Sequence, residues 1–385
     1  MESFDDIRPY CDAEVAPVLH QLVRNEDLLK AVGHFHFSGL PCCVRTLLRP
    51  LISWRLRWMV SRVHDVQGLQ KTIKSMLNTV ISRTTDELTW SGAEHLPKNR
   101  PCLLLSNHRD IVMDPALANY VLYEYGYSTA RIAIGDNLLG RPYISDLMRL
   151  NKSFIVRRSV TGRRNKFRAL QQLSAYIQHS LKEGENVWLA HREGRAKDGN
   201  DQTDTAILKM LRISYRHSQR TFADMLEELC IVPVSVSYEY DPCDIAKARE
   251  LMVRETSGGY CKEEDEDLSS IITGIEGYKG RVHVAFGAPL SPELGTPQEA
   301  AREVDRQMHS CYRLWPSNWL AWDLLEGREH HDDGHDDWRE QFDDADIAKQ
   351  EVLFQERLAQ CPQEARQWFL KIYANPVFNK LAVNQ

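Results

Sequence analysis

The spacing of hydrophobic residues changes character near residue 88. Before it, hydrophobic residues recur at helical intervals without an alternating strand pattern, and Asn25 is a candidate helix cap. After it, short hydrophobic runs alternate with stretches of helical spacing. Strands that alternate with helices predict an α/β fold, in which a mixed, mostly parallel sheet is flanked by helices. An amino-terminal helical region and carboxy-terminal helices complete the predicted fold.

Three segments follow from this pattern: a helical region over 1–87, an α/β domain over 88–325, and an acidic linker with carboxy-terminal helices over 326–385. The predicted strands cover residues 101–105, 131–135, 153–156, 187–190, 231–236 and 282–286. The predicted helices after residue 88 include 115–125, 167–181, 347–358 and 364–373.

One predicted helix of the first segment carries a hydrophobic stripe at steps of three and four residues. The stripe consists of Val44, Leu47, Leu51, Trp54 and Trp58. Arg55 and Arg62 lie at its edge, and Pro50 is expected to kink or split the helix. Tryptophans beside arginines are typical of a helix that lies on an anionic membrane surface. The alternative is that the stripe packs on the protein's own core.

Amino-acid composition limits the size of the core, the redox compartment and the membrane topology that the chain can have. The chain has 385 residues, of which 43% are hydrophobic, so it can bury a large core. Its nine cysteines show no Cys-x-x-Cys spacing, which favours a reducing compartment. No stretch reaches the roughly 18 apolar residues of a bilayer span, and the first residues do not resemble a secretory signal. We therefore expect a cytoplasmic protein that is soluble or peripheral on the cytoplasmic face of a membrane.

The net charge of −6 is unevenly distributed. Residues 326–351 contain 11 acidic and 3 basic residues, whereas residues 41–75 contain 7 basic residues and one acidic residue. The basic segment suggests an anionic partner, but the chain as a whole is not basic enough for a general nucleic-acid binder. The run from His330 to Asp337 is rich in imidazole and carboxylate, yet it is read as a solvated linker rather than a metal site.

The loop Ser106–Pro115 is the first candidate for chemistry, because it joins a buried strand to a predicted helix that begins at Asp114-Pro115. His108 lies on this loop with Asp110 and Asp114 in local reach. A histidine held by a carboxylate can remove the proton of a hydroxyl group. The alternative is that His108 only hydrogen-bonds the loop and that Asp114 only caps the helix.

Two basic clusters also follow predicted strands. One is Arg157 with Arg158, and the other lies in the run 192–197. The second contributes Arg192, Glu193, Gly194, Arg195 and Lys197. The glycine permits a tight turn, so that the cations can converge on a phosphate. The alternative is that these cations form ordinary surface ion pairs.

Four blocks, in this order, resemble the glycerophospholipid acyltransferases, which include glycerol-3-phosphate and 1-acylglycerol-3-phosphate acyltransferases. The likeness covers residues 88–325. The blocks are Asn107-His108 with a following Asp, Phe154-Ile155-Val156-Arg157, Arg192-Glu193-Gly194-Arg195, and Ile231-Val232-Pro233-Val234 continuing to Ser237-Tyr238-Glu239. The first block departs from the family, which places four residues between histidine and aspartate, whereas five separate His108 from Asp114.

The resemblance implies that His108 is the base and Asp114 its orienting group, with Asp110 as a second candidate. It implies that Arg157 and Arg195 bind the acceptor's phosphate, and that Glu193-Gly194 shape the pocket. The implied reaction transfers a fatty acyl group from a thioester, carried by coenzyme A or acyl-carrier protein, to a hydroxyl of a phosphorylated glycerol or lysophospholipid at a membrane surface. No cofactor or metal is implied. The alternatives are a non-catalytic lipid-binding or scaffold protein of this fold and an acyl-thioester hydrolase.

Overall fold

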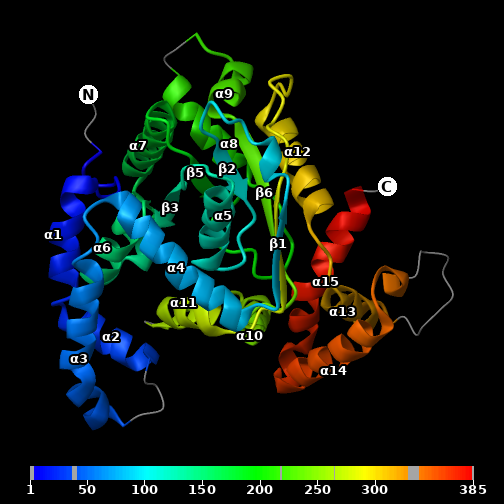
Figure 1. Cartoon of the computed structure of the whole chain (residues 1–385). Coiled ribbons are helices and arrows are strands. Elements are labelled where there is room, and N and C mark those ends of the chain that lie inside the picture. Colours follow the sequence, from blue (N-terminus) through cyan, green and yellow to red (C-terminus); the bar gives the residue numbers. More distant parts are fainter. Residues whose placement is uncertain (1–3, 37–40, 217–218, 264, 328–337, 384–385) are drawn as a thin grey trace. The chain divides into compact units, whose positions relative to one another are not determined.

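The computed structural model describes residues 4–36, 41–216, 219–263, 265–327 and 338–383 (Figure 1). The run from His330 to Asp337 lies outside the described residues. The chain divides into two compact units: Met1–Thr79 with Ala130–Val187, here called unit 1, and Val80–Thr129 with Trp188–Gln385, here called unit 2. They are defined by contacts and do not coincide with the three predicted segments, whose division by function stays a prediction.

Unit 1 combines amino-terminal helices with two parallel strands. Its elements are α1 (Asp12–Leu22), α2 (Glu26–His36), α3 (Cys42–Val60), most of α4 (Val66–Thr84), β3 (Arg131–Gly135), η2 (Asp136–Leu138), α6 (Pro142–Leu150), β4 (Ser153–Val156) and α7 (Arg163–Lys182). The Asn25 side chain accepts hydrogen bonds from two amides of the first turn of α2, which confirms it as a cap. A buried cluster that includes Val15, Leu19, Val60 and Leu150 holds the helices together.

The helix α3 runs unbroken through Pro50, so the expected split does not occur. Its striped face is exposed, with Leu47 79% and Trp54 64% accessible to solvent, whereas Ile52 on the opposite face is buried. The stripe therefore does not pack on the core of unit 1. None of the helices in the described ranges combines the length and the hydrophobicity that a bilayer crossing requires.

Unit 2 contains five strands and most of the remaining helices of the described residues. Its elements are β1 (Glu87–Ser91), η1 (Ala93–His95), β2 (Leu103–Ser106), α5 (Met113–Glu124), β5 (Val187–Ala190), α8 (Thr205–Leu211), η3 (Arg212–Tyr215), α9 (Phe222–Leu229), β6 (Ile231–Tyr238), α10 (Asp244–Ser257), α11 (Glu266–Glu276), β7 (Arg281–Phe286), α12 (Pro297–Cys311), α13 (Pro316–Glu326), η4 (Trp338–Gln341), α14 (Asp344–Gln360), η5 (Gln363–Ala365) and α15 (Arg366–Val383). Its strands lie in the order β1-β7-β6-β2-β5.

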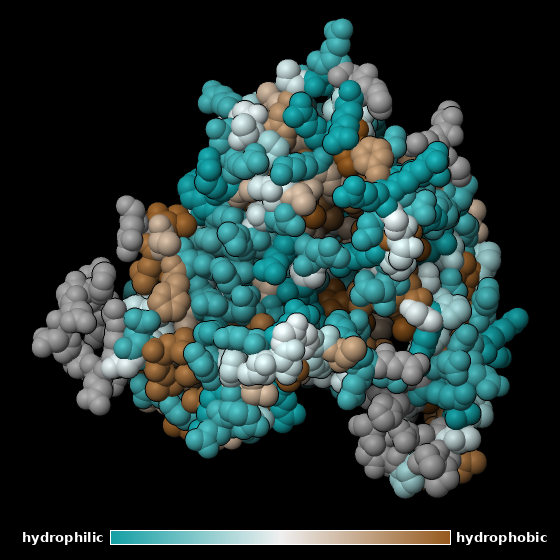
Figure 2. Space-filling view, turned by 180° about the vertical axis from the view of Figure 1, so that it is seen from behind, coloured by the Kyte–Doolittle hydropathy of each residue, from teal (hydrophilic) through white to brown (hydrophobic). Residues whose placement is uncertain are grey.

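The sheet is mixed and mostly parallel, as predicted. The pairs β1–β7, β2–β6 and β3–β4 are parallel, and β6–β7 is antiparallel. β6 is buried along its whole length, which agrees with its mostly hydrophobic sequence. The helices α13, α14 and α15 pack around a separate hydrophobic cluster that is rich in aromatic residues, and α15 contacts α10 (Figure 1). The face shown in Figure 2 is mostly hydrophilic and is interrupted by smaller hydrophobic patches.

Candidate active site

The loop after β2 brings His108 and Asp114 together in unit 2. The His108 Nδ1 atom lies 2.9 Å from Asp114 Oδ2. The side chain of His108 is 16% exposed and that of Asp114 is fully buried. When Nδ1 donates to the carboxylate, the lone pair of Nε2 becomes the basic position of the ring. The rings of Trp188 and His108 form a T-shaped contact with a centroid distance of 5.5 Å. This arrangement can accept a proton at Nε2.

Asp114 is held by four donors. Its Oδ2 atom accepts hydrogen bonds from His108, from the Arg109 amide at 2.6 Å and from the Asp110 amide at 2.9 Å. Its Oδ1 atom accepts one from the hydroxyl of Tyr238 at 2.7 Å. Burial and the charge of Asp114 raise the pKa of Tyr238 well above its usual value, so this hydroxyl stays a donor. The four bonds compensate for the loss of water around a buried carboxylate.

Asp110 has a different place. Its Oδ1 atom accepts hydrogen bonds from the amides of Val112 and Met113, at the start of α5. The helix starts one residue before Asp114, so the prediction that Asp114 caps it is wrong and Asp110 satisfies the free amides instead. Burial and the charge of Asp114 raise the pKa of Asp110. Gly274 of α11 lies against this carboxylate, where a Cβ atom would come within 2.0 Å of Oδ2.

The amides of this loop are largely occupied. Those of Arg109 and Asp110 bond Asp114, and those of Val112 and Met113 bond Asp110. These four amides are therefore not free to donate hydrogen bonds to a developing oxyanion.

The side-chain amide of Asn107 hydrogen-bonds the backbone of β6. Its Oδ1 atom accepts from the Val236 amide at 2.8 Å, and its Nδ2 atom donates to the Val236 carbonyl and to Asp201. The Arg109 guanidinium donates to the same Asp201 carboxylate at 2.7 Å and to the Gly199 carbonyl at 2.9 Å. These bonds join the histidine loop to the loop after β5 and fix the backbone on both sides of His108.

The loop after β5 carries the second basic cluster, and the Ala196 amide donates to the His108 carbonyl at 2.8 Å. Gly194 adopts a φ of 74°, which confirms the expected tight turn. The Arg195 side chain is 7% exposed, and the carboxylate of Asp267 lies 4.0 Å away. Arg192 is half-buried and Glu193 is exposed.

Lys197 is buried in an ion pair with Glu250, so its ammonium is already paired with a carboxylate. Burial lowers the pKa of Lys197 to about 8. Of the three predicted cations in this loop, Arg195 and Lys197 are buried to a similar extent beside Asp267 and Glu250, and Arg192 is half-buried.

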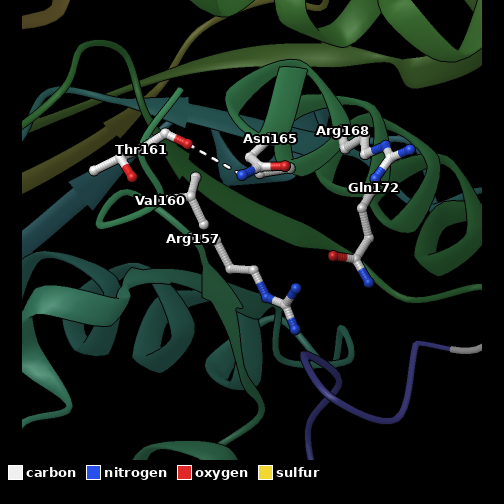
Figure 3. Close-up of a pocket in the computed structure, with 7 residues that line it drawn as sticks. Arg157, Val160, Thr161, Asn165, Arg168 and Gln172 are labelled. Atoms are coloured by element: carbon white, nitrogen blue, oxygen red, sulfur yellow. Dashed lines mark hydrogen bonds between the residues drawn. The ribbon is translucent and has the colours of Figure 1, made fainter. Parts of the chain in front are cut away.

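The first basic cluster belongs to unit 1. Arg157 is exposed and forms an ion pair with Asp6. It lines a pocket of about 450 Å³ together with Arg168, Asn165 and Gln172 of α7 (Figure 3). Arg158 is exposed, and its amide donates to Asp136 at 3.0 Å. Two guanidinium groups beside amide side chains form a cavity that suits an anion.

Several residues of the site were not predicted. Tyr238 stands in the fourth sequence block, but the sequence shows no role for its hydroxyl. Asp201 and Lys247 are polar residues within otherwise unremarkable segments, and Trp188 reads as part of a buried strand. Only the side-chain contacts reveal that these residues surround the histidine loop.

His191, the residue after β5, gives a prediction about stability. Its side chain is fully buried, and burial lowers its pKa to about 4 from an ordinary value of 6.5. Between these values the unfolded chain binds a proton that the folded protein excludes, so stability falls as the pH falls from about 6.5 to about 4. The loss from this group is about 3 kcal/mol. Urea unfolding at pH 7 and pH 4.5 should show a smaller loss in His191→Gln than in the unmodified protein. An equal loss would contradict the assignment.

Comparisons with known proteins show what this chain is similar to. A family model described as Acyltransferase matches residues 87–237, which include His108, Asp114 and the loop after β5. The dihydroxyacetone phosphate acyltransferases of Bos taurus and Homo sapiens are 25% and 26% identical, over 58% and 57% of this chain. The matches cover 31% and 29% of those proteins, so the chain aligns with less than a third of the length of these curated relatives.

A solved structure of the 1-acyl-sn-glycerophosphate acyltransferase of Thermotoga maritima is also similar. It has a TM-score of 0.37 and 13% identity, and the match covers 83% of this chain and 98% of that chain. Residues 87–237 of this chain thus match the Acyltransferase family model, and this part of the chain is similar to glycerophospholipid acyltransferases.

Proposed function

We propose that this protein transfers a fatty acyl group from an acyl thioester to a hydroxyl group of a phosphorylated glycerol or lysophospholipid. The observation that carries the proposal is the His108–Asp114 contact inside the segment that matches the acyltransferase family. A thioester is already activated, so the reaction needs a base for the acceptor hydroxyl and neither a metal nor another cofactor.

In the proposed mechanism, Nε2 of His108 removes the hydroxyl proton while the acceptor oxygen attacks the thioester carbonyl. Asp114 keeps Nδ1 protonated and stabilises the imidazolium that forms. The tetrahedral intermediate then collapses, the carbon–sulfur bond breaks, and the imidazolium returns the proton to the leaving thiolate. Arg192 and Arg195 would bind the acceptor's phosphate, and Arg157 with Arg168 offers a second anion pocket in unit 1.

A thiol-release assay with acyl-coenzyme A tests this reaction. We expect release to require an acceptor, and a panel of glycerol 3-phosphate, dihydroxyacetone phosphate and lysophosphatidate should identify which one. Acylated product should form in equal amount to the free thiol. Equal release without an acceptor would indicate the hydrolase, and no release with coenzyme A or acyl-carrier protein donors would favour the non-catalytic protein.

We also propose that α3 docks on an anionic membrane surface. Its exposed stripe presents Trp54 and Trp58, and the exposed cations Arg55, Arg57 and Arg62 lie on or next to the same helix. The Arg62 guanidinium lies 4.2 Å from the ring centre of Trp58. Tryptophan rings suit the depth of lipid headgroups and guanidinium groups suit their phosphates, so hydrophobic and charge complementarity both favour a membrane.

Liposome sedimentation should show binding that rises with the anionic lipid fraction and falls with salt. The double variant Trp54→Ala/Trp58→Ala should bind about tenfold more weakly, because it removes two large apolar side chains from the interface. The control Val352→Ala/Phe378→Ala removes exposed hydrophobic residues of unit 2 and should bind normally. Binding that does not depend on these tryptophans would exclude α3 as the docking element.

A further inference from the structure

The carboxy-terminal helices make polar contacts with the loop after β5 and, through α10, reach the loop that carries His108. All the residues concerned lie in unit 2. The contacts follow two separate routes, one through α10 and one through the loop after β5, and both routes end on Arg109, the residue after His108.

The first route starts at α14 and α15. The Arg357 guanidinium donates to Asp244 at 2.8 Å and to the Asp241 carbonyl at 3.0 Å. The hydroxyl of Tyr373 donates to Asp244 at 2.6 Å and accepts a bond from the Asp241 amide. These bonds hold the turn between β6 and α10 from the side of the carboxy-terminal helices (Figure 1).

Lys247 of α10 completes this route. Its side chain is 3% exposed, and its ammonium pairs with Asp241 and donates to the Arg109 carbonyl at 2.7 Å. The charge of Lys247 keeps the pKa of Asp241 below its usual value although burial acts in the opposite direction. A buried ammonium whose partners are a carboxylate and a loop carbonyl fixes the position of that carbonyl.

The second route starts at Asn375 of α15, which donates to the Asp198 carbonyl at 2.7 Å. The next residue, Gly199, has a φ of 80°, and a Cβ atom there would come within 2.2 Å of the Ile372 carbonyl oxygen. This loop therefore packs directly on α15. The Gly199 carbonyl accepts a bond from the Arg109 guanidinium at 2.9 Å.

We infer that Lys247 and Asn375 are positioning residues, through which the carboxy-terminal helices hold Arg109 and thereby set the orientation of His108 toward its substrate. The inference rests on the proposed function for its effect on turnover, but its effect on the His108 ring does not depend on activity. It gives the carboxy-terminal helices a role in the reaction although they lie beyond residue 237, where the family match ends.

The test replaces both members of the buried Lys247–Asp241 ion pair, so that neither charge is left unpaired. Lys247→Met/Asp241→Asn removes the bond to the Arg109 carbonyl and keeps the side-chain volumes close to the originals. A control, Lys152→Met/Glu185→Gln, removes an ion pair of unit 1 between a buried lysine and a partly exposed carboxylate. Asn375→Ala removes the second route alone. For each protein the measurements are kcat, KM for both substrates, the melting temperature, and the His108 Cε1–H resonance, assigned by its absence in His108→Ala.

We expect Lys247→Met/Asp241→Asn to lower kcat about 10-fold to 100-fold with KM changed by less than twofold, because small displacements of a reacting group carry a large cost. Asn375→Ala should give a smaller loss of the same kind. Both should shift the His108 resonance, and the control should change neither. An unmoved resonance with unchanged kcat, or an equal loss in the control, would overturn the inference. If the unmodified protein transfers no acyl group, the proposed function fails and the resonance alone decides the inference.

Discussion

His108→Ala is expected to abolish nearly all acyl transfer and to slow turnover by about 10²-fold to 10⁴-fold, which is the usual contribution of a general base. The hydroxyl of the acceptor is a weak nucleophile at neutral pH, and no other imidazole among the described residues is hydrogen-bonded to Asp114. Without the ring, the proton must leave to water as the carbon–oxygen bond forms.

The fold should survive this substitution. The His108 side chain is partly exposed, and Asp114 keeps its bonds from the Arg109 and Asp110 amides and from Tyr238. The melting temperature should therefore change little while thiol release stops. A matched control is His95→Ala, because His95 lies in the same unit with a side chain that is 73% exposed. Activity above about one tenth of the original rate in His108→Ala would exclude the ring as the base.

Most strands of the sheet could be predicted closely, because each is a short, mostly buried hydrophobic run. The strand β1 was not predicted, since its residues are only partly buried and form no such run. The predicted ranges for β3, β4 and β5 agree with the structure residue by residue. The start of α5 was harder. Asp114-Pro115 has the sequence of a capped helix start, but Asp114 bonds His108 and Asp110 takes the amides. Local sequence does not show which of two nearby carboxylates turns toward a histidine.

The exposure of α3 could not be read from its stripe. An amphipathic pattern shows which residues share a face, and the same pattern fits a buried face and a membrane-binding face. The structure leaves Leu47 and Trp54 open to solvent, which removes packing on the core of unit 1 as an explanation. Lys247 is a different case, since it reaches the Arg109 carbonyl across 138 residues of sequence and sits in an ordinary helical segment.

We expect substitutions of the two aspartates near His108 to change turnover by very different amounts. The sequence alone left both aspartates as candidates for the group that orients His108. Asp114→Asn should slow turnover by about 10²-fold or more, because it removes the negative charge that stabilises the imidazolium. The amide group also cannot satisfy the existing donors. Asp114 accepts bonds at both oxygens, so an NH₂ group in either position would face a donor, either Tyr238 or the cluster of two amides and His108.

Asp110→Asn should slow turnover less than about tenfold, because asparagine is also a good acceptor for the free amides of a helix start. The raised pKa of Asp110 further reduces the difference, since burial already disfavours its charged form. Turnover rates and melting temperatures measured side by side check the assignment. Losses of equal size in turnover would mean that Asp114 does not orient His108 in the reaction. A large loss only in Asp114→Asn would show that Asp114 orients His108 although five residues separate them in the sequence.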